Sequence, residues 1–575
     1  MSVKPAFTAA LMTSALAGLA VMAPMAMVES GPPPGQPGQG HFERGYLEQG
    51  WSPETREAFH FTPQGSRLLP YEWARALEQP DRDLPFFDED HVRRLGYIPA
   101  PGPSPLNPGG FPIGFAKEPA AEPDDGPWMG MTCAACHTGE VTIVGRRLGI
   151  DGAPSRADFQ LFMARLGAAL DATLAQPEKF TRFAERVGAA DPVALRWRIE
   201  ARAAHLRRLA AGNWTPEPYG HGRLDAFGHI LNAVAGDALN DTGNYRAPDA
   251  PVSYPFLWTA PHQRYAQWNG IAGNPIGRNL GEVLGVFGEV SLAGPEAERF
   301  RSSALAENLL RLETWVEELK APPWPAWSVG QPDAVRVERG RTLYREHCQA
   351  CHGGVPYRYT PADENLFGKR FIDVAMIPRH VVGTDSRMLD NFTRRRVETS
   401  LFAEAGQPAP EIAAGEFLTK VVGKTVERDF AAREVKEEER AAYFGHRLGR
   451  DGTPQPGWMG PPAYKAGPLA GIWATGPFLH NGSVPTLYDL LGPEEERPAV
   501  FWTGSTRFDP VKVGFVSEEA GLSAQERARL FRFDTSRPGN SNRGHAYPRG
   551  QPLDHEERLD LIAFLKTLED PDVPR

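Results

Sequence analysis

Five stretches of the chain have the pattern of apolar and polar residues that is expected of helices. They are residues 156–174, 192–210, 303–320, 334–348 and 556–569. The third carries one apolar stripe at the helical period, formed by Leu305, Leu309, Leu312, Val316 and Leu319. The fifth has one apolar face, formed by Leu561, Phe564, Leu565 and Leu568. Strand patterns are sparse, and the pattern therefore predicts a mainly α protein with long irregular loops and little β.

The helix predicted at 334–348 carries Gly340 and Tyr344 on one face, eight and four residues before Cys348. A glycine lets the backbone of a second helix approach closely, because it has no Cβ. The apolar face of the helix at 556–569 is the expected partner. We therefore predict that these two helices cross at Gly340.

Proline-rich segments divide the chain into two predicted domains. The segment APPWPAWSVGQPD at 321–333 cannot continue a helix and is predicted to be a linker. Residues 30–40 include GPPPGQPGQG and are predicted to be a flexible linker. An N-terminal domain with large insertions is therefore expected at 41–320, and a C-terminal domain at 334–575.

Residues 1–29 contain one lysine followed by an apolar run rich in Ala, Leu and Met. This pattern is typical of a secretory signal peptide. A signal anchor is the alternative, because the run from Phe7 to Val28 could nearly span a bilayer. Pro24 and the short basic flank favour cleavage. The protein is therefore expected to be periplasmic or secreted, with no stable membrane span after removal of the signal.

Composition and charge exclude several classes of protein. The net charge is −10 over 575 residues, which argues against a general nucleic-acid binder, because no basic excess is available to neutralise phosphates. Aromatic residues make up 10% of the chain, too much to leave in water, so disorder throughout is excluded. With only four cysteines, the chain is not a disulfide scaffold.

The four cysteines fall in two copies of the pattern Cys-x-x-Cys-His. The copies are Cys133, Cys136 and His137, and Cys348, Cys351 and His352. This is the attachment pattern of c-type haem, in which the thiols add to the vinyl groups and the histidine becomes the proximal iron ligand. A zinc ribbon is disfavoured, because its two pairs lie about 15–20 residues apart, and a dithiol redox motif lacks its βαβ context. The sequence predicts two covalent haems.

A further ligand of the second haem is expected in the loop before the last helix. In that loop, PGNSNRGHAYPRG, His545 is the candidate. His480, in GPFLHNGSVPTL, is the alternative, and we favour His545 because of its position before the helix. Either histidine could instead lie at the surface or support another group.

The segment 254–279, YPFLWTAPHQRYAQWNGIAGNPIGRN, is dense in aromatic and turn residues. Trp258 and Trp268 are the candidate catalytic residues, either on the distal face of the first haem or between the haems; core filling is the alternative for each. Arg278 is the candidate partner of a haem propionate. His262 could bind the first iron; without such a ligand that iron keeps an open position and can bind oxygen or peroxide.

These motifs resemble the bacterial dihaem cytochrome c peroxidase superfamily, which includes the dihaem enzyme that matures methylamine dehydrogenase. More closely, the chain resembles the rubber oxygenase branch. The segments that carry this resemblance are LLPYEWARALEQP, GMTCAACHTG, GRLDAFGHILN, YPFLWTAPHQRYAQWNG, GIWATGPFLHNGSVPTL and GNSNRGHAY. The resemblance implies two cytochrome c-like haem domains that cover nearly all of the mature chain.

The resemblance also implies roles for individual residues. His137 and His352 would be proximal ligands, and His545 would close the second haem as a bis-histidine, electron-transferring centre. The first haem would be the reactive one, and Phe256 and Phe287 are the candidates for the branch's distal phenylalanine. A calcium ion between the haems would follow from the peroxidase resemblance, without assigned ligands.

The leading hypothesis is an exported dihaem c-type cytochrome and haem-dependent oxidoreductase. The N-terminal haem would activate peroxide or dioxygen, with electron transfer through the C-terminal haem. One alternative is a non-catalytic dihaem electron carrier, and another is a dioxygenase that cleaves an apolar alkene such as polyisoprene. The expected partners are a small redox protein, as electron donor or acceptor, and peroxide, dioxygen or an apolar small-molecule substrate.

Each proximal histidine should affect one haem only. His137→Ala and His352→Ala should each remove one proximal ligand and strongly change the absorption spectrum of that haem alone, because the two motifs are separate. Mass spectrometry of the intact mature protein measures the covalent additions, for which we expect two haems per chain. A mature chain with one haem or none would contradict this prediction.

Overall fold

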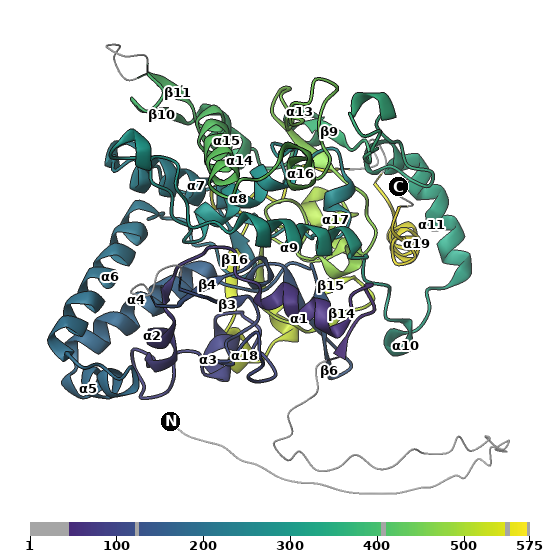
Figure 1. Ribbon diagram of the computed structural model, residues 1–575. Helices are drawn as coiled ribbons and strands as arrows, with labels where there is room; N and C mark the ends of the chain where they lie inside the picture. Colours follow the sequence, from purple (N-terminus) through teal and green to yellow (C-terminus); the bar gives the residue numbers. More distant parts are fainter. Residues whose placement is uncertain (1–44, 121–125, 404–409, 547–551, 572–575) are drawn as a thin grey trace, which may run out of the picture. The chain divides into compact units, whose positions relative to one another are not determined.

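The computed structural model describes residues 45–120, 126–403, 410–546 and 552–571 (Figure 1). In this part of the chain 41% of the residues are helical and 14% are strand. The prediction of a mainly α protein with little β is therefore wrong, and the fold class is mixed. The signal peptide and flexible linker predicted for residues 1–40 lie outside the described residues.

The five predicted helices are confirmed as α4, α6, α9, α11 and α19. The helices of the first half are α1 (Pro53–Phe61), α2 (Tyr71–Ala76), α3 (Glu89–Arg94), α4 (Phe159–Ala175), α5 (Pro177–Arg186), α6 (Pro192–Gly212), α7 (Ala226–Leu231), α8 (Pro275–Gly285) and α9 (Ala306–Glu318). Those of the second half are α10 (Ala326–Val329), α11 (Ala334–His347), α12 (Gln349–His352), α13 (Arg379–Val382), α14 (Arg387–Arg394), α15 (Ala414–Ala432), α16 (Glu437–Tyr443), α17 (Leu487–Leu490), α18 (Ala524–Arg527) and α19 (His555–Leu565).

The strands form small sheets of two or three strands. They are β1 (Gly45–Tyr46), β2 (Leu69–Pro70), β3 (Phe115–Glu118), β4 (Trp128–Met131), β5 (Thr138–Ile143), β6 (Arg146–Asp151), β7 (Arg223–Leu224), β8 (Val252–Ser253), β9 (Ala375–Pro378), β10 (Arg396–Glu398), β11 (Glu411–Ala413), β12 (Ala463–Ala466), β13 (Val500–Thr503), β14 (Phe508–Asp509), β15 (Gly514–Phe515) and β16 (Phe531–Asp534). The three-stranded sheets have the orders β1-β6-β5 and β2-β4-β3. The pairs are β7-β8, β9-β12, β10-β11, β13-β16 and β14-β15.

The strands were not predicted because most of them are short. The longest of them also lack the alternation of apolar and polar residues that identifies a strand. Most residues of β5 are buried on both faces, and the second half of β6 is buried throughout. A strand buried on both faces has no period-2 pattern of apolar and polar residues. The turn between β5 and β6 consists of Val144 and Gly145, both at positive φ, as a two-residue hairpin requires.

The crossing of α11 and α19 confirms the role predicted for Gly340, and the two helices lie side by side (Figure 1). A Cβ on Gly340 would lie 1.9 Å from the carbonyl oxygen of Asp560, so the helices approach backbone to backbone. Tyr344 packs on Phe564 with ring centroids 5.2 Å apart. Asp554 caps the N-terminus of α19 by accepting a hydrogen bond from the Glu557 N–H at 2.9 Å, which sets where this helix begins.

One apolar core contains residues from both sides of the predicted linker. Its members include Trp258, Leu312, Trp473, Phe478 and Leu561. The described residues, from Gly45 onward, belong to one compact unit. The domain boundaries at 320 and 334 therefore stay a prediction. No helix among the described residues is long and apolar enough to cross a membrane.

A methyl group at the helix crossing should destabilise the protein. Gly340→Ala would force the backbones of α11 and α19 apart, and we expect it to lower the free energy of unfolding by about 1–3 kcal/mol. Gly423→Ala on α15 is the control, because nothing lies within 4 Å of its Cβ position. It should raise the stability by about 0.5–1 kcal/mol. Denaturant unfolding measures both, and equal effects of the two substitutions would exclude the close crossing.

Candidate functional site

A cavity of ≈ 400 Å³ lies between the two Cys-x-x-Cys-His motifs. Its walls are mainly apolar, and they are contributed by segments from Phe59 to Leu565. The motif residues in its walls, together with the predicted distal ligand, are Cys133, Cys136, His137, Cys348, His352 and His545. The fold therefore brings together two motifs that are more than 200 residues apart in the sequence.

The first motif occupies the short connection between β4 and β5. The backbone N–H of His137 donates to the carbonyl of Cys133 at 2.9 Å, which closes a tight turn. The ring nitrogen Nδ1 of His137 lies 2.8 Å from the carbonyl oxygen of Pro255. A carbonyl only accepts, so Nδ1 carries the proton and Nε2 is the nitrogen left to bind a metal. Burial lowers the pKa of His137 to about 4, which keeps its imidazole neutral.

The second motif repeats this arrangement at the junction of α11 and α12. The backbone N–H of His352 donates to the carbonyl of Cys348 at 2.9 Å. Nδ1 of His352 donates to the carbonyl oxygen of Gly467 at 2.9 Å, so this imidazole is held in the same tautomer. Burial lowers the pKa of His352.

The His545 ring faces the His352 ring, with centroids 6.0 Å apart. Histidine nitrogens bind metal ions at about 2 Å, so this separation leaves room for one metal ion between the two imidazoles. The backbone of His545 is in the left-handed region, at φ 51°. Its N–H donates to the carbonyl of Val382 at 2.7 Å, and Arg497 donates to the carbonyl of the preceding Gly544 at 2.8 Å. These contacts hold a conformation that is uncommon for a residue other than glycine.

His480, the alternative ligand, also lines the cavity but pairs with Tyr464. The two rings are stacked with centroids 4.1 Å apart, and Nε2 of His480 lies 3.0 Å from the Tyr464 hydroxyl. That hydroxyl is 2.7 Å from the carbonyl oxygen of Asp385, to which it donates. The arrangement places His545, rather than His480, opposite His352.

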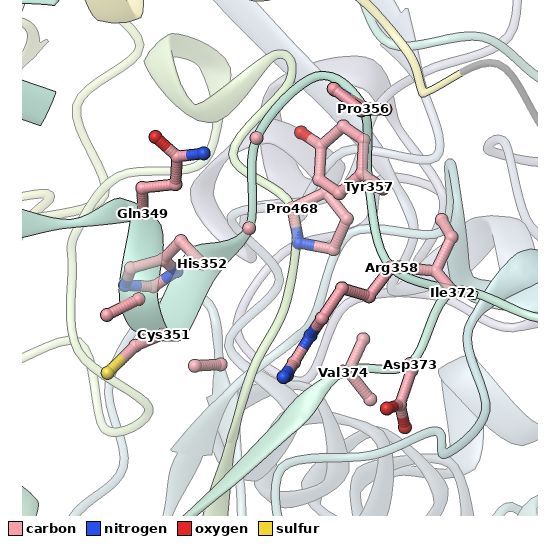
Figure 2. Close-up of a pocket in the computed structure, with 14 residues that line it drawn as sticks. Gln349, Cys351, His352, Pro356, Tyr357, Arg358, Ile372, Asp373, Val374 and Pro468 are labelled. Carbon is pink, nitrogen blue, oxygen red and sulfur yellow. The ribbon is translucent and has the colours of Figure 1, made fainter. Parts of the chain in front are cut away.

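A second pocket of ≈ 220 Å³ lies at the other side of the second motif (Figure 2). Cys351 and His352 contribute to its walls, together with Tyr357, Arg358 and Asp373. Cys348, in contrast, lines the larger cavity. The two thiols of this motif therefore border different hollows, with His352 between them.

The two tryptophans predicted as catalytic residues have different environments. Trp258 is fully buried, stacks on Phe256 with centroids 4.8 Å apart and donates from Nε1 to the carbonyl of Ala470 at 2.8 Å. It is part of the apolar core and is not among the described residues that line the cavity. Trp268 does line the cavity, and its Nε1 donates to the carbonyl of Ser253 at 3.0 Å.

His262 and the two candidate phenylalanines are also placed by their contacts. Nε2 of His262 donates to the carbonyl oxygen of Glu317 at 2.9 Å, and the described walls of the cavity do not include this residue. Phe256 lines the cavity and directly follows Pro255, so it belongs to the wall on the His137 side. Phe287 stacks on Phe159 instead, with centroids 6.1 Å apart.

The cavity contains an acidic and basic cluster that the sequence prediction found only in part. Arg278 donates to Glu313 through Nη2 and to Asn279 through Nε, the latter at 3.0 Å. Burial opposes its charge, but Glu313 and Glu282 raise the pKa of Arg278. Burial raises the pKa of Glu282, which accepts from Gln267 at 3.2 Å. Arg278 and Glu282 lie four residues apart on an otherwise mainly apolar α8, a signal that could have identified the pair.

The residues present fit two c-type haems. All four cysteines are free, and burial raises the pKa of Cys133, Cys136 and Cys348 to about 12, so that these thiols are protonated. Each pair of thiols has an imidazole beside it whose Nδ1 is engaged by a carbonyl. Calcium gains no such support, because no three His, Cys, Asp or Glu side chains of the described residues form a group that could hold a metal.

Comparison with known proteins gives a family match to a segment that lines part of the cavity. Residues 463–503 match the family described as RoxA-like, cytochrome c-like. This segment contributes Tyr464, Gly467 and His480, which are described above. The match of this segment supports a haem-containing cytochrome.

Two proteins of Sinorhizobium fredii (strain NBRC 101917 / NGR234) are similar to the chain. The uncharacterised protein y4iJ is 34% identical over 582 aligned positions, which cover 91% of this chain and 93% of y4iJ. The uncharacterised protein y4iM is 27% identical over 54% of this chain and 63% of y4iM. The chain belongs to the same family as y4iJ. Membership of the dihaem peroxidase superfamily stays a prediction.

Substitution of His545 and of His480, each by alanine, should show which of the two binds the second haem iron. His545→Ala should turn a low-spin haem high-spin and raise its midpoint potential, because loss of a strong imidazole donor destabilises ferric iron more than ferrous iron. His480→Ala should leave that haem low-spin, because His480 pairs with Tyr464. Absorption spectra and redox titration measure both variants. If His480→Ala gives the high-spin haem and His545→Ala does not, His480 is the ligand and the prediction is wrong.

Proposed function

We propose that the protein is an exported dihaem c-type cytochrome and an oxidoreductase. In this proposal Cys133, Cys136 and His137 hold a haem that reacts with peroxide or dioxygen. Cys348, Cys351 and His352 hold a second haem, which His545 closes and which transfers electrons. Export is supported by the apolar N-terminal sequence, and a small redox protein is the proposed donor or acceptor.

The observation that carries the proposal is the difference between the two motif histidines. His352 has the His545 ring opposite it at a centroid separation of 6.0 Å. The ring contact that the structure gives for His137 is with Tyr254, at 6.3 Å. An iron with one open position binds oxygen species, whereas an iron with two strong protein ligands mainly transfers electrons.

The two other histidines in the described walls of the cavity are each paired with a tyrosine hydroxyl. His229 lies 3.3 Å from the Tyr219 hydroxyl through Nε2, and that hydroxyl donates to the carbonyl of Pro248 at 2.5 Å. His480 is paired with Tyr464 in the same manner. These contacts favour an open position on the side of His137, because each of the two imidazoles is already engaged.

The residues around the first motif support a reaction that needs a dry site. The apolar walls exclude bulk water, which strengthens the electrostatic effect of the few polar groups present. Glu282 is a half-buried carboxyl in this wall, and desolvation raises its pKa. We assign it the role of holding a proton at its carboxyl group for delivery within the cavity.

Two predicted residues keep roles that follow from their contacts. Trp268 lies in the cavity wall and is the proposed aromatic bridge for electron transfer between the two haem sites. Arg278 remains a candidate propionate partner, although Glu313 already neutralises much of its charge.

Carbon monoxide binding tests the proposal. The reduced protein should bind carbon monoxide at one haem only, the one attached at Cys133 and Cys136. His262→Ala should leave this binding unchanged, because His262 donates to the Glu317 carbonyl. Absorption spectra of the reduced protein, with and without the gas, measure both.

Two outcomes would contradict the proposal. Two low-spin haems that do not bind carbon monoxide would favour the electron carrier, the second candidate class. A new carbon monoxide site that appears only in His262→Ala would show that His262 closes the first haem.

A further inference from the structure

Lys465 is a half-buried cation in the wall of the cavity. It lies on β12, and its Nζ donates to the amide oxygen of Gln263 at 2.5 Å. Among the described residues no carboxylate forms a hydrogen bond or ion pair with it. Desolvation lowers the pKa of Lys465, and the charges of Arg278 and Arg447 lower it further, to about 7. The surroundings of Lys465 are thus positively charged.

Of the three neighbouring cations, Arg278 has a carboxylate partner, whereas Arg447 and Lys465 donate to neutral oxygen atoms. Arg278 forms an ion pair with Glu313. Arg447 donates to the backbone carbonyls of Pro261, Gln263 and Arg264. The two acidic side chains of the cluster have other partners, since Glu313 pairs with Arg278 and Glu282 accepts from Gln267. A neutral amide oxygen is the partner of Lys465.

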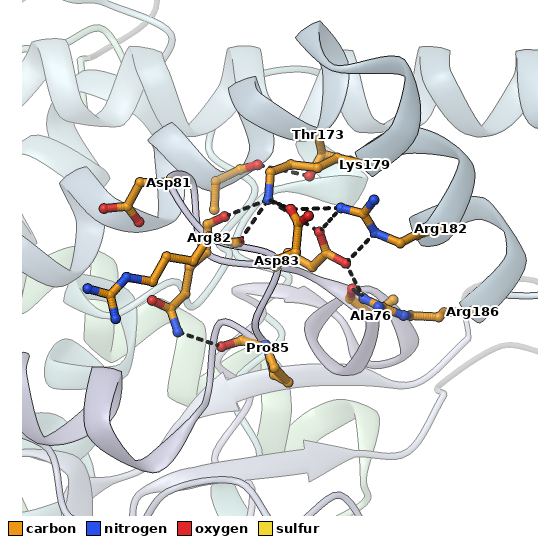
Figure 3. A network of polar contacts seen from close by, with 12 residues as sticks. Ala76, Asp81, Arg82, Asp83, Pro85, Thr173, Lys179, Arg182 and Arg186 are labelled. Carbon is orange, nitrogen blue, oxygen red and sulfur yellow. Dashed lines mark hydrogen bonds and ion pairs between the residues drawn. The ribbon is translucent and has the colours of Figure 1, made fainter.

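Lys179 shows how this chain buries a lysine that has its own anions (Figure 3). Its Nζ lies 3.2 Å from Glu78 and 2.9 Å from Asp83. It also donates to the carbonyls of Gln79 and Arg82, at 3.1 and 2.8 Å. A buried charge without such a partner is costly. The contrast indicates that the anion facing Lys465 comes from a bound group.

Lys465 lies on the chain segment that contacts His352. It lies two residues before Gly467, whose carbonyl accepts the Nδ1 proton of His352. Its own backbone N–H donates to the carbonyl of Trp268 at 2.8 Å. Lys465 is thus attached to the segment that orients the second motif histidine, and it faces the same cavity.

We propose that Lys465 binds a propionate carboxylate of the haem held by His352 and His545. This inference rests on the proposed function, because the propionate belongs to that haem. It adds Lys465 to Arg278 as a candidate propionate partner. A cation beside a haem stabilises ferrous iron relative to ferric iron, so Lys465 raises the midpoint potential of the second haem.

Lys465→Met tests the proposal, because methionine keeps an unbranched stem but has no charge. Both haems should stay attached through their thioether bonds, and the midpoint potential of the low-spin haem should fall. We expect at least a tenfold shift toward the ferric form, which is about 59 mV for a one-electron couple. Lys465→Arg should keep most of the wild-type potential, since it keeps the charge.

Lys420→Met on α15 is the matched control. Lys420 is exposed and pairs with Glu416 on its own helix, so this substitution should leave both potentials unchanged. Redox titration followed at the absorption bands of each haem measures all three variants.

Failure of this inference differs from failure of the proposed function. Two haems with wild-type potentials in Lys465→Met would overturn the role of Lys465 and leave the proposed function in place. Equal shifts in Lys465→Met and Lys465→Arg would also overturn it, because they would reflect packing rather than charge. A wild-type protein without covalent haem would overturn both proposals.

Discussion

The site depends on two hydrogen bonds from imidazole to backbone. His137 donates to Pro255, 118 residues further along the chain, and His352 donates to Gly467, 115 residues further along. Each bond places the proton of the imidazole on Nδ1 and leaves Nε2 as the nitrogen that can bind a metal. Each also ties the motif to a distant loop, so the cavity forms only when the long-range fold is complete.

The two motifs share this hydrogen bond from imidazole to backbone, but they differ in the residues that lie opposite the imidazole. His545 is held against His352 by its own backbone hydrogen bond to Val382 and by the hydrogen bond from Arg497 to Gly544. The His137 side instead has apolar walls and a half-buried carboxyl at Glu282, whose pKa is raised by desolvation. A protein that holds one metal position closed and another accessible can combine electron transfer with reaction at one centre.

Local sequence patterns predicted the parts of the fold that depend on local order. The pattern of apolar and polar residues identified α9, α11 and α19. The missing Cβ of Gly340 predicted the crossing of α11 with α19. The strands were missed because β5 is buried on both faces and most others have only two to four residues. Alternation, the signal of a half-buried strand, is absent or too short to recognise in such segments.

For the candidate site too, the sequence predicts some residues and not others. The Cys-x-x-Cys-His spacing and the loop position of His545 are visible in the sequence. Trp258 and Trp268 look alike there, yet one is core and the other lines the cavity. The role of Lys465 could not be predicted from the sequence, because it depends on contacts made by folding. Folding brings Lys465 close to Arg278, 187 residues away, and gives it no acidic partner among the described residues.

The central claim is that one haem is closed by two histidines and the other is open. Electron paramagnetic resonance of the fully oxidised protein at low temperature tests it most directly, because spin state reports axial ligation. The account predicts one low-spin and one high-spin ferric signal with equal spin counts. Two low-spin signals, or a single haem signal, would contradict it.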